Sequence, residues 1–383
     1  MKIIVLGLII IWSTSVFADG GKDKIRQNAV DKEMTDETAT LLSNIHHLQK
    51  RGMMIGQHDG VWMEEHKGLN SHFNRLSGRQ PAMVCNDFMF ITNRGNVEGS
   101  FYRVREHEIK ANIIAANRAG LYQTMCWHYN DPYIGKTFYV KDLPEEYGQN
   151  SFRSILKGGV NHETYKKDLR KVAEFSLSLK DDNGKLIPFI FRPFHEFDGE
   201  WFWWGAPYNT PEEFKAIWQF TVEYLRDTLN VHNMLYAFSP DIRFNSKEEF
   251  LIRYPGDDYV DIIGFDDYED FKYDKERTEK AKDRIRIVAE IGKEKNKPVA
   301  LTELGYFIKH NEPKKEIDAD RTKWMLEAVS EMNEYLAYIV FWGNGGTYDY
   351  CVPSAGLVGE KDFLDFLNQP FVIMNDNKEE KLK

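Results

Sequence analysis

Two glutamates stand where a carboxyl group could do acid–base or nucleophilic chemistry. Glu196 follows His195 near the end of an apolar run, and Glu303 lies in the run ALTELG. Cleaving a glycosidic bond requires such a pair, because one carboxyl group donates a proton to the leaving oxygen while the other, ionised, stabilises or attacks the anomeric carbon. A strand-end glutamate can also serve in a structural ion pair, so the hypothesis rests on finding two together.

Four large aromatic residues follow Glu196: Trp201, Phe202, Trp203 and Trp204. Aromatic faces suit the C–H surfaces of neutral sugars, although a large core that uses many rings would have the same composition. The chain is 14% aromatic and holds nine tryptophans, so both interpretations stay open. We expect Trp201 to face a cleft as a stacking platform and Trp203 and Trp204 to pack beneath it.

Eight short apolar or β-branched runs predict the strands that position these side chains. They cover residues 52–60, 81–90, 121–131, 187–197, 233–241, 260–269, 298–306 and 337–344. Segments with helical spacing and charged faces lie between most of them, at 104–120, 162–180, 211–229, 283–297 and 319–336. Eight strands alternating with helices favour a (β/α)8 barrel over an open doubly wound sheet.

The runs begin apolar, as strands buried on both faces do, and end in polar or aromatic residues. These endings are Gln57, His58, Asp59, Asn86, Asp87, His128, His195, Glu196, Asp241, Asp266, Tyr268, Glu303, Trp342 and Asn344. In a barrel they gather at one rim, where catalytic groups sit. The long connection 131–161 has no helical period, and we expect it to be a loop that forms a cleft wall on this rim.

The first eighteen residues predict a cleavable export signal, with a lysine at position 2, an apolar run from Ile3 to Trp12 and small residues up to Ala18. The run is too short to span a bilayer and no second one follows, so we expect no membrane anchor. Residues 19–50 predict an N-terminal extension and helix, and 51–383 a single catalytic barrel. We expect a monomer, exported to the periplasm rather than the medium.

Several function classes are disfavoured. The net charge is -10, with no Lys/Arg stripe or phosphate-binding loop, which argues against nucleic acid and anionic membranes as partners. The chain has only three cysteines, and an odd number cannot all pair, so they do not indicate a disulfide framework. The H-E-x-x-H zinc pattern would need histidine at position 199, which is Gly199, and DDYED at 266–270 lacks the spacing of a calcium loop. We predict no metal and no cofactor.

The motif RPFHEFDGEWFWWG at 192–205 closely resembles glycoside hydrolase family 26, chiefly exported β-mannanases. WHYND at 127–131, IGFDDY at 263–268, LTELG at 301–305 and FWGN at 341–344 extend the resemblance over nearly all of the chain after residue 18. It implies a (β/α)8 barrel with the acid/base after the fourth strand and the nucleophile after the seventh. The strand count above had independently put Glu196 and Glu303 there.

The resemblance also implies roles for single residues. Glu196 becomes the acid/base and Glu303 the nucleophile. Arg192 and His195 would hold the acid's surroundings, Tyr268 would hydrogen-bond the nucleophile, Asp266 would position that strand end, His128 would contact the minus-one sugar, Trp342 would form its floor, and Trp201 the plus-one platform.

This chain departs from the family's common pattern at Phe197 and Asp198, where many members have methionine and asparagine, and at Gly343. Some members carry at the latter position an arginine that reaches the distal glycone side. We expect the minus-two site to be built instead from the 131–161 loop or Gln57.

The expected activity is retaining hydrolysis of β-1,4-mannosidic bonds in mannan, galactomannan or glucomannan and their oligosaccharides. The first alternative is the same chemistry on mixed-linkage β-glucan or β-1,3-xylan. A non-catalytic glycan-binding protein is a second alternative, disfavoured because a binding protein has no need of both carboxyl groups.

Overall fold

The computed structural model describes residues 19–64, 68–272, 274–305, 308–309, 316–344, 349–353 and 356–375. The export signal predicted at 1–18 lies outside the described residues. No helix within those ranges is long and apolar enough to cross a membrane.

Eight parallel strands form a closed barrel, which confirms the (β/α)8 prediction. They are β1 (Met53–His58), β4 (Met83–Asp87), β5 (Tyr122–Cys126), β6 (Phe189–Arg192), β7 (Met234–Phe238), β8 (Ile262–Asp267), β9 (Val299–Leu304) and β11 (Tyr338–Phe341). Each pairs with the next, and β11 closes the ring on β1 with Met54 opposite Tyr338. Each lies inside one of the eight predicted runs. All their residues except Tyr122 are buried, which explains why the runs are continuously apolar rather than alternating.

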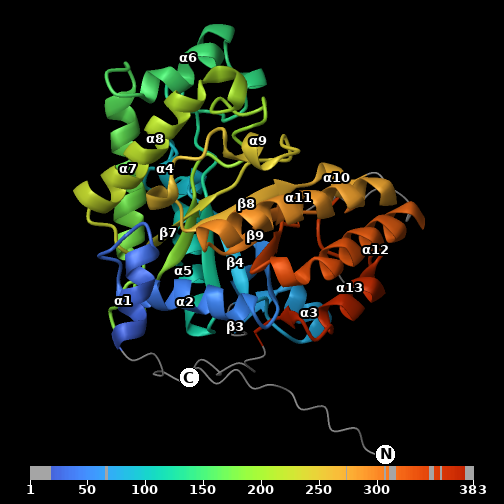
Figure 1. The fold of residues 1–383 in the computed structure, drawn as a ribbon. Helices are drawn as coiled ribbons and strands as arrows, with labels where there is room; N and C mark the ends of the chain where they lie inside the picture. Colours follow the sequence, from blue (N-terminus) through green and yellow to red (C-terminus); the bar gives the residue numbers. More distant parts are fainter. Residues whose placement is uncertain are drawn as a thin grey trace, which may run out of the picture.

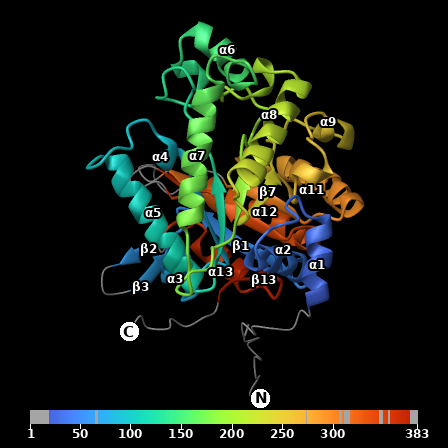
Figure 2. The same cartoon turned by 90° about the vertical axis from the view of Figure 1, so that its left-hand side faces the viewer.

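Helices form an outer layer around the strands, with α6, α7 and α8 on one side and α11, α12 and α13 on another (Figures 1 and 2). The longer ones are α5 (Phe101–Arg118), α6 (Glu145–Ile155), α7 (His162–Ser178), α8 (Pro211–Glu223), α11 (Lys275–Lys295), α12 (Glu316–Glu331) and α13 (Glu360–Leu367). Shorter ones are α3 (His72–Ser77), α4 (Met89–Thr92), α9 (Lys247–Leu251) and α10 (Glu269–Lys272). A hairpin of β2 (Val61–Glu64) and β3 (Gly68–Ser71), which the sequence analysis did not predict, follows β1.

Two helices precede the barrel, α1 (Asp19–Asn28) and α2 (Asp36–Gln49). Leu41, Leu42 and Ile45 of α2 join a cluster with side chains of the barrel strands, including Met54 and Ile190. Thr35 caps the start of α2 through its side chain. The helix therefore covers the end of the barrel opposite the rim that carries the polar residues. The short strand β13 (Val372–Ile373) pairs with the start of β1 at that same end.

The expectation that 131–161 is a loop without helix is wrong. The segment contains α6, which begins after Pro144 with two glutamates in its first turn and buries Phe152 and Ile155. Acidic residues in a first turn favour helix formation through the helix dipole. The part before α6 packs on the rim, where the ring of Phe138 lies 4.7 Å from that of His128.

Candidate active site

Glu196 lies beyond the end of β6 in a turn with strained backbone. Phe194 and Glu196 have φ angles of 52° and 53°, in the left-handed region that residues other than glycine rarely adopt. Each costs about 1–2 kcal/mol, so the surroundings must enforce the conformation. They do so here, because Phe194 is 2% exposed and the N–H of Glu196 donates to the carbonyl of Ser239 at 2.9 Å.

Glu303, in contrast, lies within strand β9, opposite Asp266 of β8, just after a shift in the register between the two strands. Arg192, at the end of β6, donates to a carboxylate oxygen of Glu303 and, at 3.0 Å, to both oxygens of Asp266. The hydroxyl of Tyr268 donates to the other oxygen of Glu303 at 2.8 Å. These donors occupy both oxygens of Glu303 and hold the side chain in one orientation.

The two glutamates face each other across the mouth of the barrel. One oxygen each from Glu196, Asp266 and Glu303 lie within 4.8 Å of one another. Retaining glycosidases hold their two carboxyl groups about 5–5.5 Å apart and inverting ones about 6.5–9.5 Å. The separation here is that of the retaining class.

The environment of Glu196 favours its protonated form. Burial, followed by the negative charges of Glu303, Asp266 and Asp241, raises the pKa of Glu196 well above its ordinary value. The indole N–H of Trp201, 2.7 Å from Oε2, opposes the rise in pKa only in part. The site therefore favours retention of a proton on Glu196, which suits this carboxyl group to donate one.

The aromatic stretch divides as predicted. Phe202, Trp203 and Trp204 are buried, whereas Trp201 is partly exposed beside Glu196. Gly199 makes this placement possible, since a Cβ there would lie 2.5 Å from the Trp201 ring. The indole of Trp204 donates to the carbonyl of His195 at 2.8 Å and so ties the core to the turn that carries the acid.

A buried chain of three side chains connects β4, the end of β5 and the turn after β6. Asp87, at the end of β4, accepts a hydrogen bond from Nδ1 of His128 at 2.6 Å, and Nε2 of His128 lies 3.2 Å from Nε2 of His195. Burial, followed by the charges of His128 and Arg192, lowers the pKa of His195 well below its ordinary value, so His195 is neutral. The sequence analysis gave Asp87 no role in the site, although its place at a strand end was the available signal.

Trp342 is partly exposed at the end of β11. Its ring stacks on that of His58 with centroids 3.9 Å apart and an interplanar angle of 13°, and it meets the His128 ring edge-on at 5.8 Å. The side chain of Gln57 is fully buried and donates to the carbonyl of Trp342 at 3.3 Å. The expectation that Gln57 builds the minus-two site is therefore wrong, because it supports Trp342 from below.

A second correction concerns Arg192, which was expected to hold the acid's surroundings. Its guanidinium is 1% exposed and its hydrogen bonds go to Glu303, Asp266 and Ser239. Arg192 thus acts on the site through Glu303, and Asp266, which was expected to position its strand end, holds Arg192 in place. Asp198, one of the departures noted above, uses both carboxylate oxygens to accept the N–H groups of Asp241 and Arg243 at 2.6 and 3.0 Å. An asparagine, with one acceptor oxygen, could not accept both bonds on separate atoms.

Comparison with known proteins agrees with this geometry. The model of glycosyl hydrolase family 26 matches residues 30–336. A mannan endo-1,4-beta-mannosidase from Bifidobacterium adolescentis is 30% identical over 385 residues, an alignment that covers 94% of this chain and 37% of that protein. The chain thus spans little more than a third of that relative's length.

Solved structures give the same picture. GH26C from a Muricauda species superposes with a TM-score of 0.88 at 38% identity, over 96% of this chain and 99% of that one. A double mutant of the endo-beta-1,4-mannanase from Cellulomonas fimi gives 0.81 at 29% identity, over 91% and 78%.

Proposed function

Because this chain belongs to glycosyl hydrolase family 26, we propose that it hydrolyses β-1,4-mannosidic bonds in mannan, galactomannan or glucomannan, and in their oligosaccharides, with retention of anomeric configuration. The observation that carries the proposal is the facing pair Glu196 and Glu303, with carboxyl oxygens within 4.8 Å, a raised pKa at Glu196 and hydrogen-bond donors on both oxygens of Glu303. The names of the similar mannanases support the choice of linkage.

In the first step the carboxylate of Glu303 attacks the anomeric carbon while Glu196 transfers its proton to the leaving glycosidic oxygen. The Glu303–mannosyl ester forms as the bond to the aglycone breaks. Arg192 and Tyr268 orient the attacking carboxylate through their hydrogen bonds. Trp201 holds Glu196 through its indole N–H and offers its exposed face to the plus-one sugar.

In the second step Glu196, now ionised, takes a proton from water, and the water oxygen attacks the anomeric carbon to release Glu303. The burial that raises the pKa of Glu196 favours its return to the protonated form. His128 lies between Asp87, His195 and the edge of the Trp342 ring, which suits it to contact the minus-one sugar above the floor formed by Trp342.

The test is product analysis on mannohexaose by NMR, together with sugar release from mannan, galactomannan, lichenan and β-1,3-xylan. We expect β-configured products to appear first and mannan-type substrates to be cleaved in preference. First-formed α products would overturn retention. Preferred cleavage of lichenan or xylan would favour the alternative substrates, and binding of mannan without any sugar release would favour a glycan-binding protein.

We also propose that residues 1–18 direct export to the periplasm and are removed, and that the mature chain acts as a monomer. The pattern of a lysine, a short apolar run and small residues supports export. Determining the N-terminus of the protein recovered from the periplasmic fraction, followed by light scattering, tests all three points. An intact Met1, recovery chiefly from the medium or a dimer mass would refute them one by one.

A further inference from the structure

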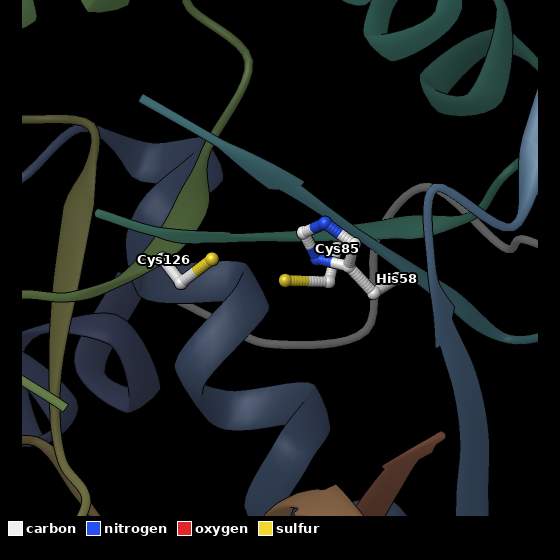
Figure 3. Close-up of side chains that lie close together, drawn as sticks. All are labelled: His58, Cys85 and Cys126. Carbon is white, nitrogen blue, oxygen red and sulfur yellow. The ribbon is translucent and has the colours of Figure 1, made fainter. Parts of the chain in front are cut away.

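Beneath the glycone side of the rim, three side chains from adjacent strands converge: His58 of β1, Cys85 of β4 and Cys126 of β5 (Figure 3). One ring nitrogen and the two sulfurs lie within 4.8 Å of one another. His58 is 6% exposed and both cysteines are fully buried. The proposed hydrolysis uses none of the three directly, so their convergence needs a separate explanation.

One polar atom of this cluster is unsatisfied. Nδ1 of His58 is buried and has no hydrogen-bond partner in the described part of the chain. Nε2 of His58 lies 3.8 Å from a carboxylate oxygen of Asp59, and the Cys85 thiol interacts with the ring. Both thiols approach the same acceptor, the carbonyl of Asn86, at 3.6 Å. Buried polar atoms usually have a partner, and an exception often marks an absent ion or water.

We propose that His58, Cys85 and Cys126 bind one thiophilic metal cation, with Zn²⁺ as the matching ion. An imidazole with two sulfurs is a donor set for zinc or copper(I) and not for calcium or magnesium. Zn–S bonds of about 2.3 Å at tetrahedral angles place two sulfurs about 3.8 Å apart, so the three atoms need only small shifts. Two thiolates neutralise the charge of Zn²⁺, which lowers the free energy needed to bury the ion. The sequence analysis predicted no metal because these ligands do not form a local motif.

A disulfide between the two cysteines fits the backbone less well. Cys85 is paired with Thr124, so Cys126 lies two residues further along the neighbouring strand. With strands about 4.8 Å apart and a rise of about 3.3 Å per residue, the two Cα atoms are separated by about 8 Å. A disulfide requires less than about 7 Å. A metal ion bridges the longer gap because it lies between the sulfurs.

The metal would also reach the sugar site. His58 stacks on Trp342, and the sulfur of Cys126 lies 3.9 Å from Nδ1 of His128. A bound ion would hold the His58 ring in place beneath Trp342. This consequence rests on the proposed function and predicts a lower KM for mannan oligosaccharides in the metal-loaded protein, whereas metal binding itself can be measured without any substrate.

The experiment uses the full chain, reduced, stripped with a chelator, and dialysed against Zn²⁺. We expect one zinc per chain by mass spectrometry and a higher melting temperature with Zn²⁺. Cys85→Ser and Cys126→Ser should lose the zinc and the thermal shift. Cys351→Ser, which removes the third buried cysteine, is the matched control and should keep both.

A second measurement uses only the wild-type protein, so it remains informative if the variants fail to fold. Cd²⁺ added to the wild-type protein should produce a thiolate charge-transfer band in the ultraviolet that saturates at one equivalent. No zinc retention and no such band in the wild-type protein would overturn the proposal, as would zinc retention that survives both Cys85→Ser and Cys126→Ser. Loss of activity with zinc still bound would instead count against the proposed function alone.

Discussion

The rim after β6 and the rim at β9 each present one glutamate to the same space, but they hold it in opposite ways. Glu196 lies in a left-handed turn backed by aromatic rings, and the main influences on its pKa are burial and nearby carboxyl groups. Glu303 lies within a strand, with Arg192 and Tyr268 hydrogen-bonded to its two oxygens. In the proposed mechanism the same type of side chain is a proton donor in one place and a nucleophile in the other, and its surroundings make the difference.

The two rims also differ in how they affect the stability of the fold. The strand around Glu303 keeps its pairing with both neighbours through a shift in register, and Glu303 forms a buried ion pair with Arg192. The turn around Glu196 holds two unfavourable backbone conformations and a carboxyl group away from water. The stability of that turn comes from the packing of Phe194 and Trp204 beneath it.

The largest effect is expected from Glu303→Gln, which removes the nucleophile but keeps its shape. We expect kcat on mannan to fall by on the order of 10⁴-fold or more, as for loss of a covalent nucleophile elsewhere. Steady-state reducing-sugar assays measure it. Glu174→Gln, an exposed glutamate on α7, is the control and should be unaffected. Turnover within tenfold of wild type would remove Glu303 from the mechanism.

Glu196→Gln should lower kcat/KM on mannan by roughly 10²–10⁴-fold, the range for loss of a general acid. The rate of the first step should fall much less for an aryl mannoside with a good leaving group, because such a group departs without receiving a proton. Equal losses on both substrates would contradict the acid role.

The same variant tests the raised pKa of Glu196. In the wild-type protein kcat/KM should decline on the alkaline side as Glu196 loses its proton, and this limb should vanish in Glu196→Gln. A carboxyl group whose pKa is raised by folding contributes stability that is lost as pH rises through the folded-state value. Glu196→Gln should therefore melt at a higher temperature than wild type in alkaline buffer, by calorimetry, and an unchanged or lower melting temperature there would contradict the raised pKa.

Arg192→Lys keeps a positive charge near Glu303 but removes the forked guanidinium group that hydrogen-bonds to both Glu303 and Asp266. We expect kcat/KM to fall by about 10²-fold, since hydrogen bonds between charged groups contribute about 1.5–3 kcal/mol each. Steady-state kinetics on mannan oligosaccharides measure this fall. Arg153→Lys, in an exposed pair with Glu213, is the control. An unchanged kcat/KM would show that the hydrogen bonds of Arg192 do not hold Glu303 for attack.

The smallest change is expected from Trp201→Phe, which keeps a platform but removes the N–H that reaches Glu196. We expect a fall in kcat of about tenfold, the value of one hydrogen bond. The alkaline limb should shift upward, because this donor lowers the pKa of Glu196. Trp62→Phe, in the β2 hairpin against His72, should change neither. A downward shift would show that the indole favours the protonated acid instead.

The barrel and the position of its two facing glutamates were predictable from the sequence for a physical reason. A strand buried on both faces must be apolar throughout, so eight such runs count the strands, and the first polar residues after each run mark the rim. Trp203 and Trp204 could be assigned to the core because several large rings together need burial. Helix α6 was missed because its buried face is short and rich in glycine and serine, with Phe152 and Ile155 as its only large apolar members.

The sequence by itself determined which side chains reach the rim, because the first polar residues after a fully buried strand can lie only at the end of that strand. It could not determine which acceptor oxygen each hydrogen-bond donor contacts. Only the tertiary structure directed Arg192 to Glu303, placed Gln57 under Trp342, linked Asp87 to His128 and brought His58 to two cysteines on other strands. These contacts depend on the stagger between strands, a property of the closed barrel that no single segment contains.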